Sequence, residues 1–154
     1  MPRELPQLDG LVEGEEVEAK AALGRDGQGA VPLSVWETYS SFANTRGGHI
    51  LLGVLERDDG SFDYVGLPDP EGLADAFWRD VCDPHVVNVN ILARADVRVV
   101  EHRGARFVVV RVPRATIAQR PVFIGRDPYH GTYIRQDDGD HRLPPAAVDL
   151  MLEG

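Results

Sequence analysis

The acidic residues near the start of the sequence are the first group whose type and spacing suit chemistry. Four of them fall within six positions, namely Glu13, Glu15, Glu16 and Glu18. If residues 15–20 form a strand beside residues 49–55, Glu18 and Glu56 converge at one edge of a sheet. Two or three carboxylates there would hold Mg²⁺ or Mn²⁺ and activate water for phosphodiester cleavage. The alternative interpretation is that this run of charge is a solvated surface.

Lys20 is the only lysine in a chain with fifteen arginines. An ammonium group is a compact charge, whereas a guanidinium group is a planar fork, so the two suit different partners. We expect Lys20 to pair with Glu18 or to contact a phosphate, although chance also explains a single lysine.

A polar corner, Asn44-Thr45-Arg46, lies directly before Gly47 and Gly48. Two glycines let the backbone come close to another group, which is either a ligand or the protein itself. In the first case the three polar residues would bind phosphate. In the second, Asn44 and Thr45 would satisfy the last carbonyls of a helix.

Arginine is concentrated in the second half of the chain. Residues 1–93 have a net charge of −11, whereas residues 94–135 carry nine arginines and a net charge of +6. Arginine next to an aromatic residue suits single-stranded nucleic acid, but it also suits any exposed strand. The candidate contacts of this region are Arg111, Arg120, Arg126, Tyr133 and Arg135, and Arg114 lies among them.

Apolar periodicity predicts about three helices that would pack on a sheet. The first opens at Pro32, places Leu33 and Tyr39 on one face, and ends at Gly47. The others cover residues 69–81, with Asp69 or Asp75 as the cap, and residues 144–152.

Strands outnumber helices in the predicted pattern. Residues 15–23 are ambiguous between strand and helix, and residues 49–55 form a central strand buried on both faces. A hairpin joins residues 97–100 and 106–112. Shorter strands are predicted at residues 62–65, 87–91, 121–124 and 132–135. The expected class is α+β: a single mixed, largely antiparallel sheet with about three helices packed on it.

Length and composition indicate one globular domain over residues 1–154, with residues 1–12 as a loose lead-in. No apolar run is long enough to span a bilayer and no signal peptide is evident, so we expect a cytoplasmic protein that binds no membrane. Cys82 is the only cysteine, which excludes an internal disulfide and a thiolate zinc cluster. We expect this cysteine to be buried. No glycine-rich nucleotide cradle is present.

Several segments together resemble the Schlafen-type AlbA-like domain, a module to which DNA binding is commonly attributed. The resemblance is carried by residues 13–20, 36–48, 51–54, 77–78, 87–92, 110–115, 120–125, 131–135 and 139–140. The last two of these are close to a bacterial subgroup labelled RecG-helicase-like or divergent AAA proteins. The resemblance covers nearly the whole chain. It implies a nucleic-acid-binding domain, free-standing or the N-terminal part of a longer transcriptional-regulator-like protein.

Some Schlafen relatives are RNA-cleaving enzymes with three carboxylates. Glu13 and Glu18 match the spacing of two of them, and Glu56 lies near the third position. The chain departs from the family pattern at two positions: Ala19 stands where the family usually has a large aromatic residue, and Glu56 stands in place of an aspartate.

Three hypotheses follow. The first is a domain that binds DNA or RNA without a cofactor, through Lys20, Asn44, Thr45, Arg46 and the arginines of residues 111–135. The second is an endoribonuclease that uses Mg²⁺ or Mn²⁺ at Glu13, Glu18 and Glu56. The third is an interaction module with neither activity. The first requires Lys20, Arg46 and Arg135 to face one polyanion, and a homodimer is compatible with all three.

Overall fold

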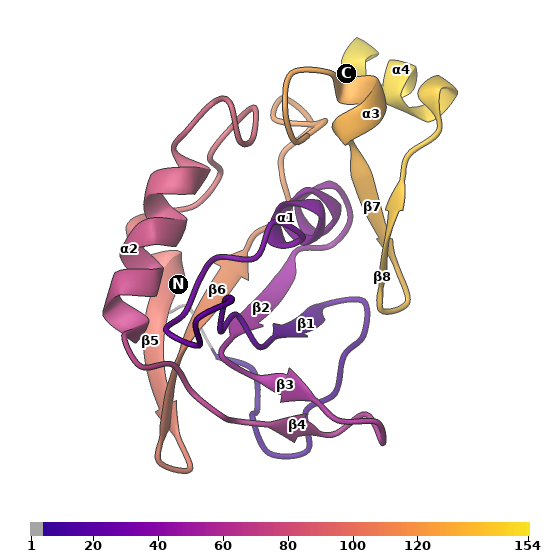
Figure 1. Ribbon diagram of the computed structural model, residues 1–154. Helices are drawn as coiled ribbons and strands as arrows, with labels where there is room; N and C mark the ends of the chain where they lie inside the picture. The colour runs from indigo at the N-terminus through magenta and orange to yellow at the C-terminus, as the bar shows by residue number, and fades with distance from the viewer. Residues whose placement is uncertain (1–4) are drawn as a thin grey trace.

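The computed structural model describes residues 5–154, and its centre is a four-stranded mixed sheet (Figure 1). In spatial order the strands are β1 (Val17–Lys20), β2 (Gly48–Leu52), β6 (Ala105–Val112) and β5 (Val97–His102). β1 runs parallel to β2, and the other neighbours are antiparallel. The α+β class is therefore confirmed, and so is the predicted pairing of the strand after Glu15 with the central strand.

Two small ribbons and the helices complete the fold. The ribbons are β3 (Leu55–Glu56) with β4 (Phe62–Asp63) and β7 (Tyr133–Gln136) with β8 (Gly139–Arg142). The helices are α1 (Val35–Asn44), α2 (Pro70–Val81), the short α3 (Pro128–Gly131), α4 (Pro145–Glu153) and a 3-10 turn, η1 (Arg94–Asp96). No helix in residues 5–154 is long and apolar enough to cross a membrane.

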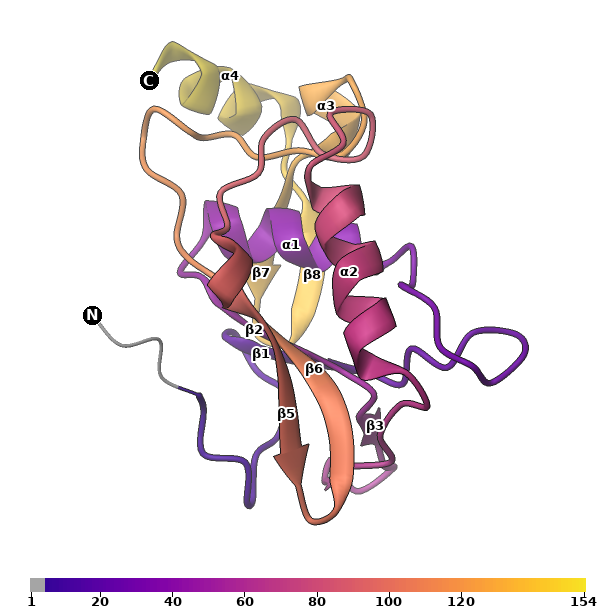
Figure 2. The same ribbon diagram turned by 90° about the vertical axis from the view of Figure 1, so that its left-hand side faces the viewer.

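β2 is the centre of the core because its apolar side chains are buried on both faces of the sheet. Ile50 and Leu52 pack with α1 and α2 on one face, whereas Leu51 packs with Phe107 on the other. Figure 2 shows both helices on the same side of the sheet. Each such side chain contributes about 1.5–3 kcal/mol by leaving water, so the near-continuous apolar run fixes β2 as the inner strand.

α1 lies between the main sheet and the β7–β8 ribbon (Figure 1). Nine of its ten residues are consequently buried. Tyr39 and Phe42 belong to the apolar core, whereas Thr38, Ser40 and Ser41 are polar and fully buried. A helix with a polar buried face needs a partner that accepts its hydrogen bonds, and the ribbon supplies that partner.

The predicted helices agree with the structure except at the start of the first helix. α1 begins at Val35, and Leu33, which was predicted on its buried face, has 88% of its surface exposed. The prediction for α2 is confirmed down to its cap, where the Asp69 carboxylate accepts a hydrogen bond from the backbone of Gly72 at 3.0 Å. The expected hairpin is β5 and β6, and the closing helix is α4.

The prediction of strands at residues 87–91 and 121–124 is wrong. Only isolated bridges form there, including one between Val87 and Ile124. Two backbone hydrogen bonds flank this bridge, from Asn88 to the carbonyl of Phe123 and from Gly125 to the carbonyl of Val86, both 3.0 Å long. The Asn88 side chain adds two more: it donates to the carbonyl of Pro121 at 3.1 Å and accepts from the backbone of Phe123 at 2.7 Å. The pairing is too short to form a strand.

Cys82 is exposed, which contradicts its predicted burial. The residue caps the C-terminus of α2, one position beyond the buried Val81. The apolar stripe of the helix ends before it, so its thiol faces solvent.

Candidate functional site

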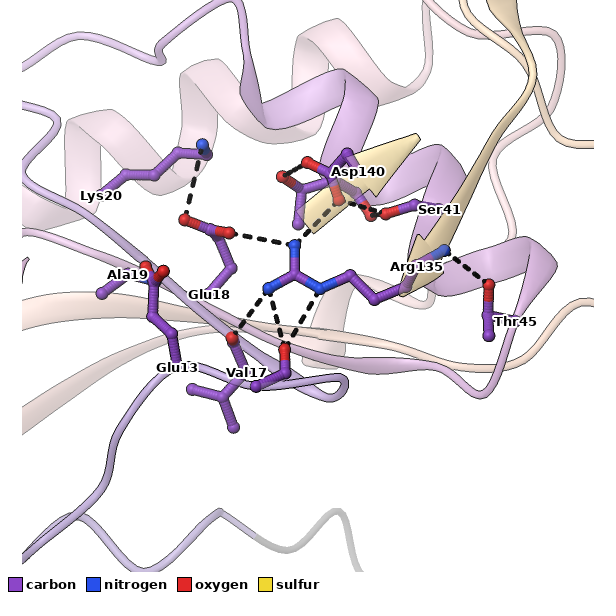
Figure 3. Close-up of polar contacts among 11 residues, drawn as sticks. Glu13, Val17, Glu18, Ala19, Lys20, Ser41, Thr45, Arg135 and Asp140 are labelled. Atoms are coloured by element: carbon purple, nitrogen blue, oxygen red, sulfur yellow. Dashed lines mark hydrogen bonds and ion pairs between the residues drawn. The ribbon is translucent and has the colours of Figure 1, made fainter. Parts of the chain in front are cut away.

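Arg135, on β7, lies at the centre of a buried polar cluster (Figure 3). One guanidinium nitrogen donates to Glu18 Oε1 at 3.0 Å and to Asp140 Oδ1 at 2.8 Å. The other two nitrogens donate to the carbonyls of Gly14, at 2.9 and 3.2 Å, and of Val17, at 3.1 Å. The guanidinium group therefore joins the ribbon to the segment that begins β1.

Asp140, on β8, extends this cluster to α1. Its carboxylate accepts hydrogen bonds from the hydroxyls of Thr38, at 2.7 Å, and Ser41. The Thr45 hydroxyl accepts from the backbone N–H of Arg135 at 2.9 Å. We call Arg135, Glu18, Asp140, Thr38 and Ser41 the buried arginine network. Among the described residues, no buried side-chain nitrogen or oxygen lacks a hydrogen-bond partner.

Burial assigns Arg135 a structural role in place of the predicted contact with nucleic acid. Its side chain is fully buried, and its guanidinium carbon lies 4.9 Å from the centre of the Phe42 ring. A phosphate could reach it only if the ion pairs with Glu18 and Asp140 were broken. Removing an arginine from such a pair leaves uncompensated buried charge, so the network is a feature of stability.

Asn44 likewise has a structural role instead of the predicted one. Its amide nitrogen donates to the carbonyls of Val122 at 2.8 Å and Tyr133 at 3.0 Å, and its oxygen accepts from the backbone of Val122 at 2.9 Å. The side chain is buried and faces the ribbon. Asn44 and Thr45 both hold the second half of the chain against α1 through these hydrogen bonds.

Two predicted catalytic carboxylates, Glu13 and Glu18, meet beside β1. Glu13 Oε2 accepts a hydrogen bond from the backbone of Ala19 at 3.0 Å, and Glu18 Oε2 lies 3.8 Å from Lys20 Nζ. Burial, a hydrogen bond to Glu18 and repulsion by the charges of Glu18 and Glu56 raise the pKa of Glu13 to about 8. Glu13 therefore holds a proton at neutral pH.

The carboxylates do not form a ready metal site. No group of three or more His, Cys, Asp or Glu side chains within residues 5–154 is placed to hold a metal ion. Both oxygens of Glu18 face cations of the protein itself, Arg135 and Lys20. Glu56 is exposed on β3 and affects Glu13 through its charge. The predicted set of Glu13, Glu18 and Glu56 forms no such group in this arrangement, and a metal ion there stays a prediction.

The two glycines of the polar corner are required by the packing of the protein itself. Gly47 has a φ of +76°, and a Cβ atom there would lie 2.6 Å from the carbonyl oxygen of Val112. At Gly48 it would lie 2.8 Å from the carbonyl oxygen of Glu16. Of the two predicted explanations for the glycines, close approach of the chain to itself is the one observed.

A cleft of about 390 Å³ lies beside these glycines, and three arginines line it: Arg46, Arg111 and Arg114. We call it the arginine cleft. The other lining residues are Pro6, Glu16, Val17, Gly47, Gly48, His49, Val112 and Pro113. The Arg46 side chain is 66% exposed and lies 3.8 Å from Glu15. Arg111 is 41% exposed and lies 3.5 Å from the buried Asp96. Arg114 is exposed and has no carboxylate partner among the described residues.

Lys20 lies away from this cleft. Val17 pairs with His49 at the beginning of the two parallel strands, whereas Lys20 pairs with Leu52 at their end. The arginine cleft adjoins Val17 and His49. Lys20 and Arg46 therefore lie at opposite ends of the paired strands, with the buried Arg135 belonging to neither surface. This corrects the prediction that all three face one polyanion.

Three other arginines of the basic second half pair with carboxylates. Arg94 pairs with Asp75, Arg103 with Asp9, and Arg106 with Glu71. Of the remaining predicted contacts, Arg120 lines an apolar pocket with Ile117, Leu150 and Met151, Tyr133 is half-buried, and Arg126 is exposed on a turn. The arginine cleft is therefore where exposed basic residues from both halves of the chain meet.

Sequence reasoning did not select Asp140, and it did not single out Arg114 from the arginines of residues 111–135. Asp140 follows Gly139 in a short hairpin, and its sequence neighbourhood gives no sign that it faces α1. Arg114 lies in a segment crowded with arginine, but only the end of β6 beside Gly47 shows that it belongs with Arg46. A buried arginine needs a carboxylate to pair with its charge. This requirement is the one signal that could have led from Arg135 to the nearby Asp140.

Comparison with known proteins agrees with the fold and the motifs. Residues 13–144 match the family model described as Schlafen, AlbA_2. No curated protein sequence matches the chain.

Two solved structures are similar. The N-terminal domain of a RecG-related protein from Nitrosomonas europaea, solved by NMR, is 28% identical, with a TM-score of 0.54 over 83% of this chain and 81% of that one. A crystal structure of a Corynebacterium diphtheriae protein is 18% identical, with a TM-score of 0.57 over 91% of this chain and 24% of that one. The chain thus spans about a quarter of the latter protein, and that likeness concerns the fold alone.

Proposed function

Because this chain belongs to the Schlafen AlbA_2 family, we propose that it is a nucleic-acid-binding domain and that the arginine cleft is its contact surface. The family and the likeness to a RecG-related N-terminal domain suggest a nucleic-acid-related domain. The observation that supports a specific surface is the meeting of Arg46, Arg111 and Arg114 around one concavity.

The distribution of charge supports this surface over any other. The chain carries a net charge of −9, which opposes indiscriminate attraction of a polyanion. Binding then depends on a local group of cations that are exposed and incompletely paired. The arginines of the cleft meet that condition, whereas Arg135 is enclosed by two carboxylates.

The test is a binding measurement with fluorescently labelled single-stranded RNA and DNA at low ionic strength, read by anisotropy. The protein should bind, and the double variant Arg46→Ala and Arg114→Ala should weaken binding by roughly tenfold or more. The matched control is Arg57→Ala, an exposed arginine that pairs with Asp63 after β3. Equal loss in both variants, or no binding at all, would contradict the proposal.

An endoribonuclease is the second candidate, and the observation that favours it is the meeting of Glu13 and Glu18 next to Lys20. The test is incubation of labelled RNA with and without Mn²⁺, followed by gel electrophoresis. Cleavage that stops with EDTA and with Glu18→Gln, while binding survives, would support an enzyme. Intact RNA under all conditions would remove this candidate, and absence of both binding and cleavage would favour an interaction module.

A further inference from the structure

We propose that the arginine cleft binds a short stretch of single-stranded nucleic acid, about two or three nucleotides, through its phosphates and without reading base identity. This inference rests on the proposed function and specifies its ligand. It follows from three features of the described chain: the surfaces of the long helices, the lining of the cleft, and the number of cations in it.

The long helices do not suit recognition of a duplex. A protein that reads the major groove inserts a helix with exposed basic or polar side chains. α1 is excluded because nine of its ten residues are buried. α2 exposes one basic side chain, Arg79, beside Glu71 and Asp75, which already pair with Arg106 and Arg94. α4 exposes Asp149 and Glu153 and has no basic residue. Neither helix offers the several basic or polar contacts that a groove-reading helix uses.

The lining of the cleft suits phosphates more than bases. Three arginines outnumber its one carboxylate, Glu16, and the remaining side chains of the lining are those of His49, Pro6, Val17, Val112 and Pro113. Sequence-tolerant proteins that hold bases stack them on Phe, Tyr or Trp, and none of these lines the cleft. A guanidinium group matches the geometry of a phosphate through two parallel hydrogen bonds. The cleft therefore favours contact with the sugar–phosphate backbone.

The number of cations limits the length of the ligand. Three guanidinium groups engage at most about three phosphates, and Arg46 and Arg111 are each partly satisfied by a nearby carboxylate. A volume of about 390 Å³ is at the lower end of the range for small-molecule sites. Arg103 and Arg106, at the opposite end of β6 from the cleft, are already paired with carboxylates.

The experiment measures anisotropy with labelled oligonucleotides of mixed sequence, about 3, 6, 12 and 24 nucleotides long, and with a duplex of about 24 base pairs. Affinity should change less than about threefold beyond the shortest strand, once corrected for the number of equivalent positions. The duplex should bind no more tightly than the single strand. The slope of log K against log salt should be about −2, because each single-strand phosphate contributes about 0.7.

Variants test whether the cleft is the place of contact. Arg114→Ala should weaken binding roughly five- to tenfold and reduce the salt slope by about 0.7. Arg57→Ala, between β3 and β4 and beyond the other end of β2, should change neither quantity. Circular dichroism of both variants checks that they fold.

The outcomes separate this inference from the proposed function. Binding that strengthens steadily with length, a salt slope well beyond −3, or preference for the duplex would overturn the short single-stranded ligand while leaving nucleic-acid binding intact. Strong dependence on base sequence would do the same. Absence of binding to every oligonucleotide would overturn both.

Discussion

The buried arginine network and the arginine cleft use the same side chain in opposite ways. Arg135 has no exposed side-chain surface, and carboxylates and backbone carbonyls accept hydrogen bonds from all three of its guanidinium nitrogens. Arg46 has 66% of its side chain exposed and one carboxylate at 3.8 Å. The first arginine stabilises the fold and is closed to a ligand, whereas the second is open to one. Burial and partners, and not residue type, decide which arginine can bind a phosphate.

Replacement of Arg135 should have the largest effect on stability. Arg135→Ala leaves Asp140 without its cation and Glu18 with Lys20 alone, and removal of one partner from a buried ion pair costs about 3–5 kcal/mol. The midpoint of urea unfolding, followed by circular dichroism, measures this change. An unfolding free energy within about 1 kcal/mol of the wild type would mean that the network contributes little.

Replacement of Gly47 should be the next most damaging change. Gly47→Ala puts a Cβ atom 2.6 Å from the carbonyl oxygen of Val112 at a φ of +76°. Backbone strain and overpacking together should lower the unfolding free energy by about 2–4 kcal/mol. The control is Gly60→Ala, which also has a positive φ but no atom within 4 Å of the added Cβ. An equal loss of unfolding free energy in both variants would mean that backbone strain alone causes it and that close packing at Gly47 contributes nothing.

Glu13→Gln should change the pH dependence of stability. The pKa of Glu13 is about 8 in the folded chain and 4.5 when the group is unperturbed. Between these values the folded state holds a proton that the unfolded state has lost, so the wild-type free energy of unfolding falls as pH rises. The variant lacks this proton. It should be as stable as the wild type near pH 5 and more stable above pH 8.

The gain should be on the order of 1–2 kcal/mol, after discounting for solvent around a half-buried carboxyl group. Urea unfolding at a series of pH values measures it. Parallel stability profiles for the two proteins would contradict the raised pKa.

Arg114→Ala should have the smallest effect on stability and yet a clear effect on binding. The side chain is exposed and has no carboxylate partner in residues 5–154, so its loss should change the unfolding free energy by less than about 0.5 kcal/mol. Its predicted loss of oligonucleotide affinity should remain. A variant that is destabilised as much as Arg135→Ala would remove the distinction between the two arginines.

The sequence allows good prediction of elements formed by neighbouring residues. The β5–β6 hairpin follows from two β-rich segments around a tight turn, and the start of α2 follows from Asp69 before Pro70. Residues 87–91 show the limit of this reasoning. Their alternation predicts a strand, but their backbone pairs with residues 123–125 over a single bridge, to which the Asn88 side chain adds two hydrogen bonds.

The site is harder to predict because its contacts join distant parts of the chain. The family resemblance indicated Glu13 and Glu18 correctly as neighbours, but it did not show that Arg135 and Lys20 occupy both oxygens of Glu18. The basic charge of residues 94–135 likewise left two interpretations open, a contact with nucleic acid or the ordinary exposed side of strands. Carboxylates supplied by the acidic first half neutralise much of this charge, and only the three-dimensional arrangement shows which arginines remain open.

The sequence separation in the buried arginine network has a consequence for synthesis on the ribosome. Glu18 and Arg135 are 117 residues apart, and Thr38 and Asp140 are 102 residues apart. A growing chain therefore cannot pair Glu18 with Arg135, or the hydroxyl of Thr38 with Asp140, until nearly all of it has been translated. Native packing of the first helix must await the last ribbon, so this domain completes its folding only after its C-terminal part has left the exit tunnel.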